Sequence, residues 1–310
     1  MVRCKEAIKA GTRSHAQISG LDFFADAADR RFGAACQEAD MSFDREPVVA
    51  GQFYAGRQDQ WLATVQACMR GEKENEQFTR LAMVPHAGHV FSGGVAGQTL
   101  ARARLTDTVL LLGPNHTGMG APLAVWPDGK WLLPGAALEV DAELAAALLT
   151  AEPALSADRT AHLQEHSLEV ILPFLWAKNP AMRIVPIAVG DPRPHKLGGA
   201  ASKIAEVLAA LGRDVSIVVS SDMNHFASDE KTRSIDQHAI DRILALDPMG
   251  FYGTVKAENI SMCGVLPMTL GMHLANIQGA KKAELVAYAT SGDVNGDMSR
   301  VVGYAGVIIE

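Results

Sequence analysis

The chain has 310 residues, of which 48% are hydrophobic and 20% are charged, a composition typical of a folded globular protein and unlike that of a disordered or collagen-like chain. Lys and Arg number 28 against 35 Asp and Glu, which gives a formal net charge of −7 at pH 7. The sequence therefore lacks the basic excess that drives binding to nucleic-acid phosphates, and we expect no nucleic-acid partner.

The cysteines and the hydropathy bear on the cellular compartment. Cys4, Cys36, Cys68 and Cys263 are far apart and show no paired spacing, so a disulfide framework is not expected. No stretch approaches the roughly 18 consecutive apolar residues of a membrane span, and no apolar run follows the basic N-terminal residues as in a signal peptide. We therefore expect a cytoplasmic protein with no membrane partner.

Residues 1–45 differ from the rest of the chain. They mix Ala, Arg, Asp and Gln without a strand pattern, and only a short amphipathic helix over residues 21–32 is indicated. Met41 is an alternative start of the chain, so this segment is either a peripheral arm or a gene-start artefact. We interpret residues 1–45 as a weakly structured or peripheral extension and residues 46–310 as a single domain.

From residue 80 onward, short apolar runs alternate with amphipathic stretches of helical period. The runs span residues 81–84, 108–112, 184–189, 215–219, 284–289 and 301–309. The amphipathic stretches span residues 95–104, 142–149, 167–177, 196–211, 232–246 and 265–277. This alternation predicts an α/β protein with one three-layer α/β/α domain, whose central sheet is mixed, largely parallel and covered by helices on both faces.

Histidine or aspartate follows several of the predicted strands. His86 comes after the first run, His116 after the second, and Asp222 and His225 after the run that ends at residue 219. Ligands bind at the carboxyl ends of strands in open α/β sheets, so these side chains converge on one patch if the strands are parallel. One histidine after a strand is more often a hydrogen-bonded loop residue, but the recurrence at several strands favours a shared metal site.

Cys263 stands apart from the other cysteines because it directly precedes the predicted helix at 265–277, with Ser261 as the candidate N-cap. In the first turn of a helix, exposed N–H groups favour the thiolate, which is the form that binds metal. A small buried hydrophobic residue is an equally open interpretation. The other three cysteines lack this setting, and we interpret them as structural.

Residues 162–166 match the H-x-x-E-H pattern, in which two histidines one turn apart hold zinc and the glutamate acts as a general base. The loop-like residues 152–158 argue against a continuous helix through His162 and His166. We instead place Glu165 and His166 at a helix start, where one of them can point into a site. Zinc-dependent hydrolysis through His162 and His166 is kept as a remote alternative.

Several short motifs occur in an order that is specific although each motif alone is weak. They are Val48-Val49-Ala50-Gly51-Gln52-Phe53-Tyr54, Pro85-His86-Ala87-Gly88 with Ser92-Gly93, Leu112-Gly113-Pro114-Asn115-His116, Glu165-His166-Ser167-Leu168-Glu169, Ser220-Ser221-Asp222-Met223-Asn224-His225, Met262-Cys263-Gly264 and Thr290-Ser291-Gly292-Asp293-Val294-Asn295-Gly296-Asp297. With these motifs, the chain resembles the Memo family from Val48 to its C-terminus.

The resemblance implies a fold like that of the class III extradiol dioxygenases, which hold non-haem Fe(II) with two histidines and a carboxylate. It maps the metal site to His86, His116 and Cys263. A thiolate in place of the carboxylate brings copper and zinc into competition with iron, which stays the favoured ion, and departs from the ligand set of ordinary catechol cleavage. The family is linked to metal-dependent redox chemistry, and its eukaryotic members to binding of phosphotyrosine peptides.

The leading hypothesis is a single-metal redox protein, a dioxygenase-like oxidoreductase, that acts on a small molecule in the cleft. His86 and His116 would be neutral ligands and Cys263 the anionic ligand. The catalytic residues would be His166, Asp222 and His225, which orient a ligand, move protons or contact the substrate. The alternative is a binding module without turnover that holds a peptide or metabolite in the same cleft.

Overall fold

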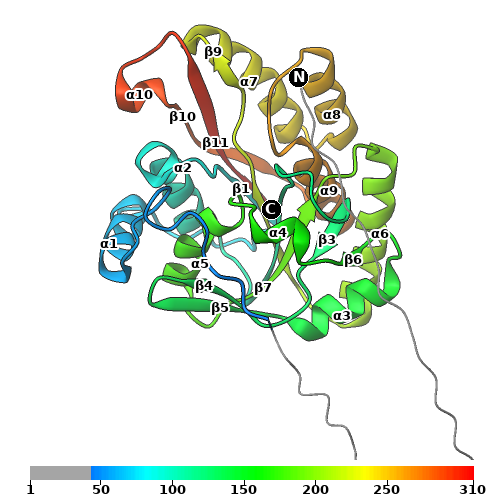
Figure 1. Ribbon diagram of the computed structural model, residues 1–310. Helices are drawn as coiled ribbons and strands as arrows, with labels where there is room; N and C mark the ends of the chain where they lie inside the picture. Colours follow the sequence, from blue (N-terminus) through cyan, green and yellow to red (C-terminus); the bar gives the residue numbers. More distant parts are fainter. Residues whose placement is uncertain (1–42) are drawn as a thin grey trace, which may run out of the picture. The chain divides into compact units, whose positions relative to one another are not determined.

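The computed structural model describes residues 43–310 (Figure 1). The helix expected at residues 21–32 lies outside the described residues, as do Cys4 and Cys36 and all of the expected extension except residues 43–45. The boundary between residues 45 and 46 therefore stays an expectation. Within the described residues, none of the helices has both the length and the apolar character needed to cross a membrane.

A mixed sheet with a parallel centre forms the middle layer, as predicted, and its strand order is β10-β11-β1-β8-β2-β7-β3-β6. The parallel centre consists of β1 (Leu81–Val84), β8 (Ser216–Ser220), β2 (Thr108–Pro114) and β7 (Arg183–Val189). Antiparallel pairs flank it, and they involve β10 (Ala283–Thr290), β11 (Val301–Ile309) and β3 (Leu123–Val125), beyond which β6 (Ser156–Ala157) lies parallel to β3. Parallel strands buried on both faces require continuous apolar runs, which is the pattern that the sequence shows.

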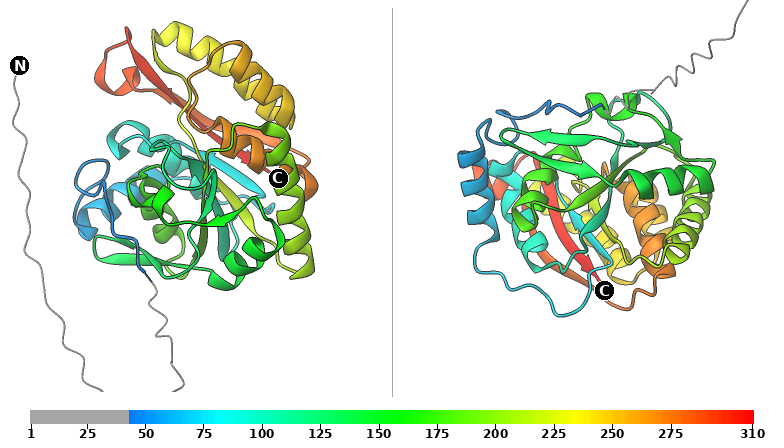
Figure 2. Two further views of the ribbon diagram at one scale, coloured as in Figure 1. Left: turned by 45° about the vertical axis from the view of Figure 1, so that its right-hand side comes forward. Right: turned by 90° about the horizontal axis from the view of Figure 1, so that it is seen from below.

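Alternate residues of the central strands supply two separate hydrophobic cores, one on each face of the sheet. Leu81 and Met83 of β1 belong to one core, and Ala82 and Val84 belong to the other. The first core is closed by α3 (Ala142–Ala151), α6 (Pro194–Ala210), α7 (Asp229–Leu244), α8 (Pro248–Ala257) and α9 (Val265–Ile277). The second is closed by α1 (Gln58–Met69), α2 (His89–Arg102) and α5 (Leu172–Lys178), and Figure 2 shows the two helical layers with the sheet between them.

The short elements connect this framework at its edges. A hairpin of β4 (Lys130–Leu133) and β5 (Ala136–Val140) joins β7, and β9 (His225–Ala227) pairs with the start of β11. The remaining short elements are α4 (Thr160–Leu163), the 3₁₀ turn η1 (Glu169–Ile171) and α10 (Gly292–Asn295).

The structure differs from the predicted elements in a few places. The helix expected at 167–177 is instead η1 followed by α5, because Pro173 occupies the first turn of α5 and fixes a helix start there. Helices α1 and α8 and the β4–β5 hairpin were not predicted. In α1 the side chains of Trp61 and Val65 alone are buried, so its hydrophobic period is too sparse to signal a helix.

Candidate metal centre

Three histidines from separate parts of the chain meet at the carboxyl edge of the parallel strands. His86 follows β1, His116 follows β2, and His166 lies in the loop between α4 and η1. Only β8 separates β1 from β2 in the sheet, and the three strands run in the same direction, so both strand ends open at the same edge. One ring nitrogen of each histidine lies within 4.8 Å of the others. We call His86, His116 and His166 the histidine cluster.

The rings of the histidine cluster are packed against one another. The centroids of His116 and His166 are 4.8 Å apart with the rings stacked at 20°, and His86 presents an edge to both at 5.3 and 5.5 Å. His86 is 2% exposed, whereas the side chains of His116 and His166 are 34% and 27% exposed. The cluster therefore has a closed inner side and a side that solvent reaches.

The protonation of His86 is set by a hydrogen-bond chain. Ser220 Oγ donates to the carbonyl oxygen of Ser167 at 2.7 Å, so its own lone pair accepts from His86 Nδ1 at 2.7 Å. Burial lowers the pKa of His86 well below its ordinary value, and the neighbouring His116 and His166 lower it further. His86 is therefore a neutral imidazole with a lone pair on Nε2, the form that binds a metal.

Glu165 fixes the second imidazole. Its Oε1 accepts from His116 Nδ1 at 2.9 Å and its Oε2 accepts from the His116 amide at 2.5 Å. Burial raises the pKa of Glu165, but the hydrogen bonds from His116 and Ser167 outweigh it and leave the pKa at about 2. Metal-binding histidines commonly donate the ring N–H that does not face the metal to such a carboxylate, and here the contact leaves Nε2 of His116 free.

Cys263 adjoins the histidine cluster at His86, where its Sγ lies 3.3 Å from Nε2. The group of donors that all lie within 4.8 Å of one another consists of the three histidines, so His166 joins the two histidines that the sequence suggested as ligands. Burial raises the pKa of the Cys263 thiol above its ordinary value, and the charge of Asp222 adds to this.

The predicted helix-start setting of Cys263 was wrong. Helix α9 begins at Val265 with Gly264 as its N-cap, so Cys263 precedes the cap and does not lie in the first turn. Ser261, the expected cap, instead uses its Oγ to accept from the His225 amide at 2.8 Å. The helix therefore offers no argument for a thiolate at Cys263.

Asp222 and His225 lie beside the cluster, after β8. Asp222 Oδ1 accepts from the amides of His86 and Ala87 at 2.8 and 3.3 Å, and burial raises the pKa of this carboxyl. His225 Nδ1 donates to the carbonyl oxygen of Ser261 at 2.7 Å, which leaves Nε2 as the acceptor of the neutral ring.

His162 faces away from the histidine cluster. It is fully buried, its Nε2 donates to the Ala124 carbonyl at 3.0 Å, and its ring contacts the edges of Trp126 and Trp131. Helix α4 ends at Leu163, before His166. Zinc hydrolysis through His162 and His166 required one continuous helix, so this alternative is wrong.

Two buried polar residues near the site, Ser220 and Arg45, had no role assigned from the sequence, and Ser220 contacts His86 Nδ1. Ser220 was part of a motif without a role, and Arg45, which lies outside every motif, is 1% exposed and paired with Glu169 at 2.8 Å. A polar residue that ends an otherwise apolar strand, as Ser220 does, was the available signal. Arg45 offered none, because its partners are more than 100 residues away in the sequence.

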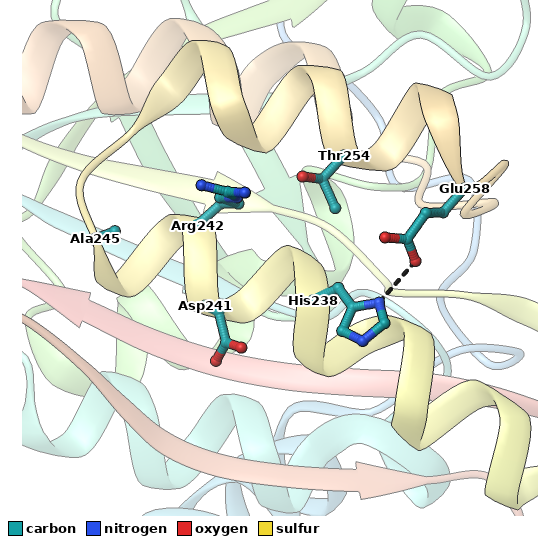
Figure 3. A pocket seen from close by; sticks show the side chains of 6 residues that line it. All are labelled: His238, Asp241, Arg242, Ala245, Thr254 and Glu258. Atoms are coloured by element: carbon teal, nitrogen blue, oxygen red, sulfur yellow. Dashed lines mark hydrogen bonds and ion pairs between the residues drawn. The ribbon is translucent and has the colours of Figure 1, made fainter.

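A separate hollow of about 420 Å³ lies between α7 and α8 (Figure 3). It is lined by His238, Asp241, Arg242, Ala245, Thr254 and Glu258. Within it His238 Nδ1 contacts Glu258 Oε2 at 2.7 Å, while Arg242 pairs with Asp247, which lies outside the lining. Among residues 43–310, the histidine cluster is the group of three or more metal donors that lie within 4.8 Å of one another.

Comparisons with known proteins agree over most of the chain. A family model described as Memo-like protein matches residues 45–308. MEMO1 family proteins from Methanopyrus kandleri and Methanosarcina barkeri are 37% and 39% identical to this chain, covering 86% of it and 98% and 100% of their own lengths. The crystal structure of an uncharacterized Escherichia coli K12 protein aligns with a TM-score of 0.49 and 11% identity, covering 74% of this chain and 99% of that one.

Proposed function

The chain belongs to the Memo family, and on that premise we propose that its histidine cluster, with Cys263, holds one transition-metal ion that supports redox chemistry on a small molecule. His86 and His116 are two of the ligands. The third ligand is one of the two donors that adjoin His86, namely Cys263 or His166.

The observation that carries the proposal is the spacing of three imidazole nitrogens within 4.8 Å at one edge of the sheet. Metal bonds of about 2.0–2.3 Å place ligand atoms roughly 3–4 Å apart, so the present spacing needs only small side-chain adjustments. The Nδ1 atoms of His86 and His116 are already hydrogen-bonded to Ser220 and Glu165, respectively. A metal therefore meets imidazoles whose tautomer is set in advance.

The donor chemistry fits several ions. Neutral imidazoles suit iron, copper and zinc, and a thiol at the edge of the site favours the softer ions of this group. We place iron first and keep copper and zinc as competitors. When bound, iron or copper supplies a redox-active Lewis acid at the carboxyl edge of the sheet.

The residues around the cluster have separate tasks in this proposal. His225 accepts a proton at Nε2, since its Nδ1 donates to Ser261. Asp222, whose pKa is raised by burial, accepts from the amides of His86 and Ala87 and so holds the loop that carries His86. Where Cys263 is the third ligand, the partly exposed His166 contacts the substrate from the open side of the cluster.

The first test is metal content. The wild-type chain, purified without oxygen in the presence of Fe(II), is expected to carry about one ion per chain by plasma mass spectrometry, in line with a single shared site. His86→Ala and His116→Ala should abolish this, and His166→Ala and Cys263→Ser show which donor completes the set. His195→Ala, at an exposed histidine of α6, is the matched control. Unchanged metal content in His86→Ala and His116→Ala would contradict the proposal.

The second test separates redox chemistry from binding alone. Oxygen or peroxide consumption is measured on the loaded wild type with a panel of catechols and other small diphenols, against His86→Ala. Consumption that depends on the metal supports the redox proposal. A protein that binds one metal ion yet consumes no oxidant is instead a binding module, with a peptide or metabolite as its ligand.

A further inference from the structure

Arg45 lies under the loop that carries two members of the site. Its Nε donates to the His162 carbonyl at 2.9 Å, and its Nη2 donates to the Glu165 carbonyl at 2.6 Å. Its Nη1 pairs with Glu169 Oε2 at 2.8 Å, and the guanidinium lies 4.3 Å from the ring centre of Trp131. One buried side chain therefore holds the start, the middle and the end of residues 162–169, which we call the cluster loop.

Glu169, the partner of Arg45, also contacts residues 48–54. Its carboxylate accepts from the amides of Val48 and Val49 at 2.8 and 3.0 Å and from Tyr54 Oη at 3.0 Å. We call Arg45, Glu169 and Tyr54 the Arg45 clamp. The segment at residues 48–54, which Glu169 binds, also carries Phe53. The ring centre of Phe53 lies 5.0 Å from that of His166.

We propose that Arg45 is a positioning residue for the histidine cluster, which sets the cluster loop so that Glu165 meets His116 and His166 meets His86. Arg45 touches neither the ring nitrogens nor the carboxylate of Glu165, so it acts through backbone carbonyls. The expected effect of Arg45 on metal affinity rests on the proposed function. The contacts of Arg45 with the cluster loop do not involve a metal.

Only an arginine has the geometry for this task. Three nitrogens of one planar group reach three acceptors in fixed directions, whereas the ammonium of lysine is a single point of charge on a flexible stem. Arg45→Lys therefore keeps a charge beside Glu169 but cannot hold both carbonyls of the cluster loop. Arg213→Lys is the matched control, because Arg213 also pairs with a buried carboxylate, that of Asp141, at the opposite end of β2.

The test uses Co(II) as the probe, because its visible spectrum reports the number and geometry of its ligands. We expect Arg45→Lys to lower Co(II) affinity roughly 10- to 100-fold and to change the spectrum, as loss of outer-shell support does at metal sites. Tyr54→Phe removes one hydrogen bond of the clamp and should cause a smaller change in the same direction, which keeps the test open if Arg45→Lys does not fold. Arg213→Lys should leave affinity and spectrum at the wild-type values.

A second readout needs no metal. In the metal-free protein at one fixed pH, the imidazole ¹⁵N signals of His116 and His166 are expected to move in Arg45→Lys, while that of the remote His273 stays in place. If the cobalt data and these signals match the wild type, or if Arg213→Lys causes the same changes, the inference is overturned. If the wild type binds no Co(II), the proposed metal function fails, and the metal-free signals alone decide the role of Arg45.

Discussion

The carboxylate of Glu165 shows how one residue decides the chemistry of its neighbours. It is fully buried, it accepts from His116 at both the ring and the amide, and its Oε1 lies 3.6 Å from His166 Nδ1. Such a group stays ionised only because it is fully hydrogen-bonded, and in return it fixes which nitrogen of His116 carries the proton.

Glu165→Gln should therefore weaken metal binding more than it weakens the fold. The amide keeps the shape of the side chain but removes the charge that holds the proton on His116 Nδ1. We expect a loss of roughly 10- to 100-fold in Fe(II) or Co(II) affinity, measured by competition with a chromophoric chelator. Glu258→Gln is the matched control, because Glu258 makes the same kind of contact with His238 at an exposed position. Equal affinities in the two variants would contradict this role of Glu165.

The sequence predicted the residues of the site unevenly. His86 and His116 were singled out because each lies a few residues after a continuous apolar run, and a strand end is a position that can be read locally. Glu165 and His166 were placed at a helix start from which one of them could point into a site, and the contact of Glu165 with His116 was not foreseen. Arg45 was invisible, since its partners are carbonyls that the folded chain alone brings within reach.

At the level of elements, the hydrophobic pattern was sufficient where a segment is wholly buried. The runs at 81–84 and 301–309 are β1 and β11, and the stretch at 265–277 is α9, with the predicted bounds. Helix α1 was missed because most of its residues face solvent. Besides burying Trp61 and Val65, α1 approaches α2 closely, where Gly97 lies against the backbone of Cys68.

Gly97→Ala should separate α1 from α2. A Cβ at residue 97 would lie 2.5 Å from Cys68 Cβ and 2.7 Å from its backbone, so one helix must move, at a cost of about 1–3 kcal/mol in the free energy of unfolding. Gly94→Ala in the same helix meets open space and should stabilise the protein by about 0.5–1 kcal/mol. Equilibrium urea unfolding compares the two variants. A Gly97→Ala protein as stable as Gly94→Ala would show that the helices do not depend on this contact.

At the scale of the whole molecule, the site depends on strand order. β8 lies between β1 and β2, although residues 216–220 follow both of them by about 100 residues or more in the chain. The alternation of strands and helices predicted the layers, but it carries no information on which strands are neighbours, so the meeting of Asp222 with His86 depended on an assumed parallel sheet. The two cores on either face of the sheet bury both sides of the central strands.

The buried His162 couples the stability of the whole molecule to pH. It joins β3, through the Ala124 carbonyl, to Trp131 of β4. Burial lowers its pKa from the ordinary 6.5 to about 4, the bond to Ala124 opposes this shift, and the charge of Arg45 reinforces it. Between these two pH values the unfolded chain binds the proton and the folded chain does not. The contribution of His162 to the free energy of unfolding is therefore fully present above pH 6.5. It is lost as the pH falls toward 4, by up to about 3 kcal/mol.

His162→Gln tests this coupling because the amide still offers an N–H to Ala124 but cannot titrate. The free energy of unfolding is measured by urea at several pH values between 4 and 6.5, and the variant should lose less stability on acidification than the wild type, even though it starts lower at neutral pH. His195→Gln alters an exposed imidazole of α6 and should leave the wild-type pH dependence unchanged. Other groups titrate in this range, such as Asp236, whose pKa burial raises to about 6, but they are present in both proteins and their contribution cancels in the comparison. An acid dependence that survives unchanged in His162→Gln would mean that another group senses the pH.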